Sequence, residues 1–247
     1  MTKTPHILLL AGSFEARHLA EQLSEQGLQY TAWLSEAPRG SAMMPQVPLL
    51  RPFTDGAAMQ AAVAEGGFTA VMDASHTFDR SVTHQAVATV QALDLPYLRL
   101  ERPAWETQGR AHWCRVPDVA QGNARISQGA RVFCATGWDS LSGYAGFAGE
   151  VLLLRQTRRH RRLAPYPFVE LVFGDPPFNA HDEQALFKRL SVDTLICRNL
   201  GGAASRPKLD AADALGLDVI LIDRPAAPEG TASVADVGAA LEWVRGL

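Results

Sequence analysis

The chain has 247 residues, a formal net charge of −3 and 47% hydrophobic residues. This length suits one large domain or two smaller lobes with well-buried cores. The slightly acidic charge argues against nucleic acid as a main partner, because such partners select strongly basic surfaces.

The cysteine pattern and the absence of targeting signals predict where the chain works. Cys114, Cys134 and Cys197 are odd in number and form no CxxC pair, which indicates free thiols in a reducing compartment. No apolar run reaches the length of a membrane span, and the first residues lead directly into a strand, without room for a signal peptide. We therefore expect a cytoplasmic protein that neither binds nor crosses a membrane. The sequence does not determine the oligomeric state, and a monomer is the working assumption.

Strand and helix patterns alternate along the chain, which predicts an α/β fold with mostly parallel sheets. The first strand, at residues 7–11, is entirely apolar and stops at Gly12. A helix then runs from Glu15 to Gln26, and Gly27 supplies a common helix stop. The first half continues with strands at 29–34, 47–50, 70–73 and 97–100 and with helices at 55–65 and 80–93.

The second half repeats this alternation. Its first strand, at 131–137, is apolar and again breaks at a glycine. The further elements expected are strands at 149–156, 168–173, 193–198 and 219–222 and helices at 181–190, 209–215 and 234–245.

A short repeat links the two halves. Residues 95–103 read Leu-Pro-Tyr-Leu-Arg-Leu-Glu-Arg-Pro, and residues 217–225 read Leu-Asp-Val-Ile-Leu-Ile-Asp-Arg-Pro. We predict two Rossmann-like lobes, 1–120 and 121–247, with a ligand cleft between them at the carboxyl ends of their strands. The alternative is that any two βα units share this much pattern.

Two loops of the first half are candidates for binding a dinucleotide. After the first strand, Gly12, Ser13 and Arg17 stand at a helix N-terminus, where a phosphate is favoured, although a simple helix cap explains them equally well. After the second strand, Ser35 and Arg39 favour the 2′-phosphate of NADP, and the neighbouring acid Glu36 leaves an NAD-type ribose contact open. An ordinary solvated loop is the alternative for this segment.

A third loop gathers chemically active side chains. Asp73, Ser75 and His76 follow a strong strand, and an acid, a hydroxyl and an imidazole at a strand end are typical of a working site. The surrounding residues do not match a nucleophile elbow. His76 is a candidate proton or hydrogen-bond donor, or a cap of the next helix.

The second half carries candidates for anion binding. The run 155–162 contains five arginines, among them Arg158 and Arg159, and it is either a solvated loop or a site for carboxylates. The segment 196–202 runs from a strand into Asn199 and two glycines, and Lys208 follows; a plain connecting turn is the alternative. The histidines show no paired metal spacing, so no metal site is expected.

Several motifs together resemble the precorrin-6A reductase and cobalt-precorrin-6A reductase family. Residues 11–17 read Ala-Gly-Ser-Phe-Glu-Ala-Arg against the family's Gly-Gly-Thr-x-Glu-Ala-Arg, and 73–78 read Asp-Ala-Ser-His-Thr-Phe against Asp-Ala-Thr-His-Pro-Phe. Residues 102–105 match Arg-Pro-x-Trp, and 174–178 match a Gly-x-Pro-Phe-like element. Residues 198–202 read Arg-Asn-Leu-Gly-Gly where the family has Lys-Asn-Ser-Gly-Gly. The resemblance covers nearly the whole chain.

This resemblance implies that the chain takes a hydride from NADPH and reduces a ring double bond of precorrin-6A, a tetrapyrrole polycarboxylate, to give precorrin-6B. The rival functions are an NADP-dependent reductase of a smaller anionic substrate and a non-catalytic module that senses NADP. The residues expected to bind the cofactor are Gly12, Ser13, Phe14, Glu15, Arg17, Ser35, Arg39, Asp73, Ala74 and Ser75. The residues expected to bind the substrate are Thr136, Gly137, Arg158, Arg159, Arg198, Asn199, Gly201 and Gly202, with His76 and Lys208 as candidate proton donors.

Overall fold

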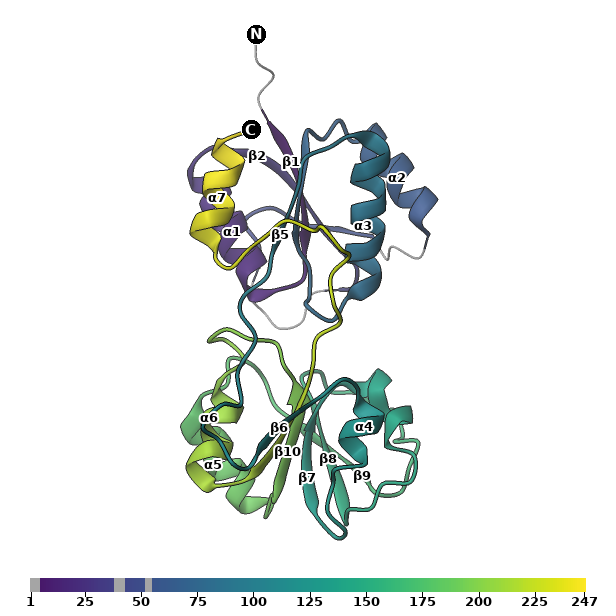
Figure 1. Cartoon of the computed structure of the whole chain (residues 1–247), viewed down its shortest axis with the longest axis vertical. Coiled ribbons are helices and arrows are strands. Elements are labelled where there is room, and N and C mark those ends of the chain that lie inside the picture. Colours follow the sequence, from purple (N-terminus) through teal and green to yellow (C-terminus); the bar gives the residue numbers. More distant parts are fainter. Residues whose placement is uncertain (1–4, 38–42, 52–54) are drawn as a thin grey trace. The chain divides into compact units, whose positions relative to one another are not determined.

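A computed structural model describes residues 5–37, 43–51 and 55–247 of the chain. It confirms the predicted α/β class, because the strands form two six-stranded, entirely parallel sheets. The chain divides into two compact units, one of residues 1–103 and 225–247 and the other of residues 104–224. Figure 1 shows a sheet flanked by helices in each unit.

The first unit has the strand order β3-β2-β1-β4-β5-β12, which is the order of a dinucleotide-binding fold. Its strands are β1 (His6–Ala11), β2 (Gln29–Leu34), β3 (Leu49–Leu50), β4 (Ala70–Ala74), β5 (Tyr97–Leu100) and β12 (Ser233–Val234). Its helices are α1 (Phe14–Glu25), α2 (Gly56–Glu65), α3 (Arg80–Leu93) and α7 (Val237–Arg245).

The second unit repeats the same order as β9-β8-β7-β10-β11-β6. Its strands are β6 (Trp113–Val116), β7 (Arg131–Ala135), β8 (Val151–Gln156), β9 (Val169–Phe173), β10 (Thr194–Arg198) and β11 (Asp218–Ile222). Its helices are α4 (Val119–Asn123), the 3-10 helix η1 (Trp138–Tyr144), α5 (Ala180–Arg189) and α6 (Pro207–Leu215).

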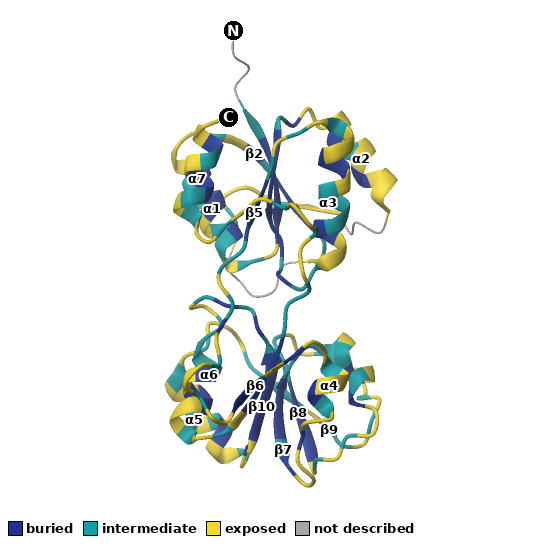
Figure 2. Cartoon of the chain, viewed as in Figure 1, coloured by how far each residue is buried: buried dark blue, intermediate teal, exposed yellow. Residues whose placement is uncertain are grey.

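Each sheet is covered on both faces, so its central strands are continuously apolar rather than alternating. In β1, Ile7 and Leu9 pack toward α1 and α7, whereas Leu8 and Leu10 pack toward α2 and α3. Figure 2 shows the resulting buried sheet in each unit between helices with exposed outer faces. With the strands buried in this way, the polar residues at their carboxyl ends are the part of the sheet open to ligands.

The predicted boundary between residues 120 and 121 differs from the observed division. β6 pairs with β11 and therefore belongs to the second sheet, although it precedes residue 120. β12 pairs with β5, and α7 packs on α1, so the C-terminal segment belongs to the first unit. The chain changes unit after Pro103 and again after Arg224. The repeated Arg-Pro pair thus marks the two crossings, at which each unit's sixth strand is supplied by the other half of the sequence.

Candidate functional site

Gly12 brings two strand ends of the first unit together. A Cβ on Gly12 would lie 2.8 Å from the backbone nitrogen of His76 and 3.4 Å from the Cα of Ser75. Carbon atoms do not approach a backbone nitrogen that closely without a shift, so a glycine is needed where the β1–α1 turn meets the segment after β4. The predicted site residues that follow β1 and β4 are therefore neighbours in the fold. We call Gly12, Ser13, Arg17, Ser75 and His76 the first-unit corner.

Ser13 is the N-cap of α1. This is the helix-cap role that the sequence offered as the alternative to phosphate binding. Its hydroxyl accepts a hydrogen bond from the amide of Ala16 at 3.1 Å and donates to the carbonyl of Ala74 at 2.8 Å. The Ser13 amide also donates to Ala74, at 3.2 Å. Ser13 and Ala74 thus join α1 to the end of β4 and aim the positive end of the α1 dipole at the corner.

Asp73, expected to touch the cofactor, is fully buried and hydrogen-bonded inside the protein. One carboxylate oxygen accepts from the amide of Ser75 at 2.9 Å. The other accepts from Thr83, Tyr97 and Arg99, each at 2.8 Å. A carboxylate with four donors of its own acts by fixing the backbone of Ser75, which places Asp73 behind the corner.

The electrostatics of this network follow from its burial. Burial, reinforced by the charge of Asp73, raises the pKa of Tyr97 well above its ordinary value. Burial lowers the pKa of Arg99, but the charges of Asp73 and Glu101 raise it by more, so the net direction is upward. Tyr97 therefore stays neutral and Arg99 stays charged, and the Asp73 carboxylate keeps its counter-ion.

Two polar atoms at the corner lack a hydrogen-bond partner among the described residues. They are Oγ of Ser75, whose residue is only 4% exposed, and Nε of Arg17, one turn into α1. Buried polar groups are normally paired, so an unpaired hydroxyl just after β4 and an unpaired guanidinium nitrogen in the first turns of α1 indicate a bound ligand or water. A hydroxyl, a guanidinium and a helix N-terminus are the donors that a dinucleotide phosphate requires, so the residues present fit that group.

The first residues of α1 are only partly accessible to a ligand. Phe14 is 44% exposed, with its ring 4.6 Å from that of His18. Glu15 forms an ion pair with Arg102, a residue of the Arg-Pro-x-Trp motif. This pair fastens the first crossing segment to α1, and it explains why an acid stands at a helix end that attracts phosphate.

At the end of β2, the structure offers fewer free donors for the cofactor than the sequence predicted. Ser35 donates from its hydroxyl to Asp79 at 2.6 Å, so this donor is already engaged with a carboxylate. Arg39, the predicted partner of the 2′-phosphate, lies outside the described residues. The choice between NADP and NAD therefore remains a sequence-based prediction.

His76 follows Ser75 in the corner and is partly exposed. Its Nδ1 accepts a hydrogen bond from the amide of Phe78 at 3.2 Å, and its carbonyl accepts one from the amide of Asp79 at 2.7 Å. In a neutral ring this places the proton on Nε2, which makes His76 a donor. Both predicted roles, a local cap and a hydrogen-bond donor, are compatible with this geometry.

In the second unit, Thr136 belongs to a buried polar network rather than to the surface. Its hydroxyl lies 2.7 Å from Oγ of Ser140, 3.0 Å from the hydroxyl of Tyr144 and 3.1 Å from Sγ of Cys134. Ser140 in turn donates to the carbonyl of Gly137 at 2.7 Å. Because Thr136 is 1% exposed, its side chain holds the turn after β7 and does not reach a ligand.

Gly137 and Arg198 lie side by side at the carboxyl end of the second sheet. Gly137 has a φ of 92°, which favours glycine. A Cβ at this position would lie 3.6 Å from the nearest guanidinium nitrogen of Arg198. These two predicted substrate residues are thus brought together by β7 and β10.

Asn199 is a structural clamp. It accepts from the amide of Trp105 at 2.8 Å and donates to the Trp105 carbonyl at 2.9 Å. The indole of Trp105 donates to the carbonyl of Gly202 at 3.1 Å. Gly201 and Gly202 both have a φ of 69°, so the turn needs glycine at both positions. This segment therefore anchors Trp105, the aromatic residue of the Arg-Pro-x-Trp motif.

Arg158 and Arg159 are exposed in the loop between β8 and β9. Aromatic contacts hold this loop at the carboxyl end of the sheet. The ring of His160 meets Trp138 edge-on at 5.1 Å and Phe173 at 5.6 Å, and Arg159 lies 5.5 Å from the ring centre of Phe173. These contacts attach the loop to η1 and β9, and its arginines are exposed beside the end of β8.

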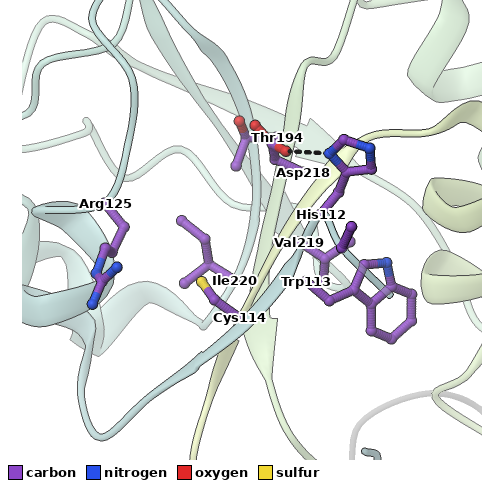
Figure 3. Close-up of a pocket in the computed structure, with 9 residues that line it drawn as sticks. His112, Trp113, Cys114, Arg125, Thr194, Asp218, Val219 and Ile220 are labelled. Carbon is purple, nitrogen blue, oxygen red and sulfur yellow. Dashed lines mark ion pairs between the residues drawn. The ribbon is translucent and has the colours of Figure 1, made fainter. Parts of the chain in front are cut away.

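A pocket lies at the opposite end of the same sheet, where the strands begin. Its lining residues include the first residues of β6, β10 and β11, and Figure 3 shows Arg125 apart from the other labelled side chains. His112 and Asp218 pair there at 3.5 Å, and burial raises the pKa of Cys114. Ligands of parallel sheets bind at carboxyl ends, so we do not place the site here. Within the described ranges, no three His, Cys, Asp or Glu side chains are grouped to hold a metal.

The sequence did not single out several residues that shape these sites. Arg99 supports the first-unit corner through Asp73, and its signal is a charge between leucines in a short strand. Tyr144 supports Gly137 through Thr136 and Ser140, and no signal in the sequence marked it. Side chains that act from behind a site are seen only when the fold is known.

Known proteins of one family match this chain over nearly its whole length. Residues 6–245 match the family model described as Precorrin-6x reductase CbiJ/CobK. Precorrin-6A reductases of Mycobacterium tuberculosis and Rhodobacter capsulatus are each 34% identical, over 98% and 97% of this chain and 98% and 94% of their own lengths. A solved structure titled CobK precorrin-6A reductase aligns with a TM-score of 0.91 and 29% identity, covering 98% of this chain and 96% of that one. In the part of the chain that is described, no helix is long and apolar enough to cross a membrane. The chain belongs to the precorrin-6x reductase family.

Proposed function

We propose that this chain uses NADPH to reduce a double bond of the precorrin-6A macrocycle, which gives precorrin-6B in cobalamin biosynthesis. Its family makes it an oxidoreductase of corrin metabolism. The names of relatives that are 34% identical along nearly the whole chain support this substrate. The three free cysteines support a reducing cytoplasm as the compartment.

The observation that carries the cofactor assignment is the pair of unpartnered atoms at the first-unit corner. Bound NADPH supplies the hydride. The chain's task is to hold its phosphates, for which Ser75, Arg17 and the N-terminus of α1 offer donors around Gly12. Asp73 keeps the Ser75 backbone in place from behind, so the corner is preorganised before the cofactor arrives.

The second unit supplies positive charge for a polycarboxylate. Arg158 and Arg159 are exposed at the carboxyl end of β8, and Arg198 lies beside Gly137. Guanidinium groups bind carboxylates through paired, charge-assisted hydrogen bonds. These residues therefore bind and orient the acidic side chains of the tetrapyrrole, which holds the reacting carbon in one position.

A proton must also reach the carbon next to the one that receives the hydride. His76 carries a donor nitrogen when its ring is neutral, because Nδ1 accepts from Phe78. Lys208 is the other side chain that the sequence proposes, and its ammonium donates to the carbonyl of Ser205 at 2.6 Å. His76 and Lys208 are candidates, together with a water molecule.

The test is an anaerobic incubation of the purified chain with precorrin-6A and NADPH, followed by the absorbance of the reduced nicotinamide and by mass analysis of the corrin. Formation of precorrin-6B with equal consumption of NADPH is expected. NADPH binding without turnover would point to a sensing module. Turnover of a smaller anionic acid, with none of precorrin-6A, would point to a different reductase.

The choice of cofactor has its own test. Arg39→Ala should raise the KM for NADPH by about tenfold and leave the KM for NADH nearly unchanged, because only NADPH carries the 2′-phosphate. Arg51→Ala is the matched control, since Arg51 lies over the ring of Trp33 and is assigned no contact with the cofactor. An equal loss for both cofactors would remove Arg39 from the 2′-phosphate site.

A further inference from the structure

A pocket of about 210 Å³ opens at the carboxyl end of the second sheet. Ala135 at the end of β7 and Phe133 form part of its wall, with Phe178 and the Pro176–Pro177 turn. The charged side chains that line it are Arg155 from β8, Glu183 from α5 and Lys208 from α6. Its volume is several times the ~30 Å³ of a water molecule and below the ~300 Å³ of a pocket for a whole drug-sized ligand. The pocket therefore suits one side chain of a large molecule.

Arg155 is buried at this pocket and contacted from several sides. Its side chain is 8% exposed and pairs with Glu183, itself 5% exposed, at 2.7 Å. The guanidinium carbon lies 4.9 Å from the ring centre of Phe133 and 4.3 Å from that of Phe178. A Cβ on Gly174 would come within 3.1 Å of a terminal nitrogen of Arg155. The motif 174–178 thus wraps the guanidinium.

The Nε–H group of Arg155 is a hydrogen-bond donor that has no acceptor among the described residues. An unpaired, nine-tenths buried guanidinium donor costs free energy unless a ligand or water accepts from it. Because Glu183 occupies the NH2 end of the group, this donor is available to a second acceptor. Arg155 lines the pocket, which gives an acceptor a route toward this donor.

Lys208 adds positive charge at the same pocket. It is the second residue of α6, so the ammonium and the positive end of the helix dipole act together. Its Nζ donates to the carbonyl of Ser205 at 2.6 Å and lies 5.6 Å from the ring centre of Trp105. Two cations and one carboxylate line the pocket, and this balance favours an anion.

We propose that this pocket binds one carboxylate-bearing side chain of the tetrapyrrole, with Lys208 as its counter-charge and Phe178 packing on its methylene groups. The inference rests on the proposed function, since it takes the tetrapyrrole as substrate. It assigns Lys208 to substrate binding and thereby leaves the proton to His76 or water. Arg155 is a positioning residue that shapes the pocket and offers one further donor.

The experiment compares three variants with the wild type in the NADPH oxidation assay with precorrin-6A. Lys208→Met should raise the KM for precorrin-6A at least tenfold, with kcat within about threefold of the wild type. Lys208→Arg should restore most of the KM, because a guanidinium keeps the charge but does not release a proton. Lys188→Met, which removes an exposed lysine on α5, is the matched control and should behave as the wild type.

A loss of kcat in both Lys208 variants with an unchanged KM would make Lys208 the proton donor and overturn the inference. Absence of turnover by the wild type would instead defeat the proposed function, so the two failures are distinguishable. Binding supplies a second readout. Uroporphyrin, a macrocycle with eight carboxylates, should bind the wild type more tightly than Lys208→Met, whereas NADPH should bind both equally.

A competition experiment with free propionate tests whether the pocket binds a side chain of the macrocycle or a small free acid. Propionate should compete with uroporphyrin only weakly, because it lacks the rest of the macrocycle. Propionate binding as tight as that of uroporphyrin, and equally sensitive to Lys208→Met, would mean that the pocket serves a free acid, and it would overturn the assignment.

Discussion

Arg99 donates to the carboxylate of Asp73 at 2.8 Å, and both side chains are at most 5% exposed. The pair joins neighbouring strands β5 and β4, behind the point where Asp73 accepts from the amide of Ser75. A buried charge pair adds little net stability, but removal of one partner is costly because the other charge is then left buried without a counter-ion. The geometry of the first-unit corner therefore depends on a residue that does not reach it.

Arg99→Met should lower the free energy of unfolding by about 3–5 kcal/mol, because the buried Asp73 would lose its ion-pair partner. Arg115→Met is the control, since its pair with Asp223 at 2.7 Å is partly exposed and its loss should cost below about 1 kcal/mol. Urea denaturation of both variants measures the difference. Equal costs would show that Asp73 finds other compensation.

Ser75→Ala should separate stability from cofactor binding. Oγ of Ser75 has no partner among the described residues, so its removal should raise the free energy of unfolding by up to about 1 kcal/mol. The same change should weaken NADPH about fivefold, through loss of one hydrogen bond of about 1 kcal/mol. Thermal unfolding and fluorescence titration with NADPH give the two values.

Ser140→Ala is the contrast to that variant, because its hydroxyl donates to the carbonyl of Gly137 at 2.7 Å and its loss should destabilise the protein. If Ser75→Ala bound NADPH as tightly as the wild type, Ser75 would have no part in the cofactor site.

Gly12→Ala should weaken NADPH at least tenfold, a change of about 1.4 kcal/mol. The added methyl would lie 2.8 Å from the backbone nitrogen of His76, so the two strand ends must move apart. Gly56→Ala is the matched control, because a Cβ there meets its nearest described neighbour, Cγ of Gln85, at 3.9 Å. Isothermal titration with NADPH checks both, and an undisturbed affinity in Gly12→Ala would contradict the close approach.

Stability should fall at alkaline pH. Burial raises the pKa of Cys197 to about 11, against about 8.5 in an unfolded chain. Since the unfolded state loses this proton first, the contribution is complete below about pH 8.5 and declines as the pH rises toward 11, by up to about 3 kcal/mol. Cys134 and Tyr97, whose pKa values are also raised by burial, act in the same direction.

Urea unfolding of the wild type and Cys197→Ala at about pH 8 and about pH 10.5 isolates the thiol. The wild type should lose more free energy of unfolding between these values than the variant loses. Parallel losses would show that Cys197 does not titrate differently on unfolding.

The sequence predicted the elements well where they are long and apolar. The β1–α1 unit is an example, because a run of leucines followed by a small-residue corner has few other solutions. β6 and β12 were not predicted. They lie at sheet edges, β12 has only two residues, and each pairs with a strand from the other half of the sequence. No local pattern contains that information.

The sequence predicted where the candidate site lies in the fold better than it predicted what each side chain does there. Polar residues at strand ends, such as Asp73, Thr136 and Asn199, were identified correctly as lying at the carboxyl ends of the sheets. Their side chains turned out to bond inward, because partners arrive from residues as distant in sequence as Arg99 and Trp105. Residue type and position do not reveal which way a side chain turns.

The exchange of the sixth strands sets an order on how the protein is made. The core of the first unit includes Ala240, Leu241 and Val244 of α7, which pack with Leu19 and Leu23 of α1. A ribosome delivers these residues only after the whole second unit has been translated. Until then, the apolar surface that α7 covers beside α1 stays exposed in residues 1–103, and a nascent chain in that state is open to aggregation or to a chaperone. The second unit, continuous from 104 to 224, is free to fold first.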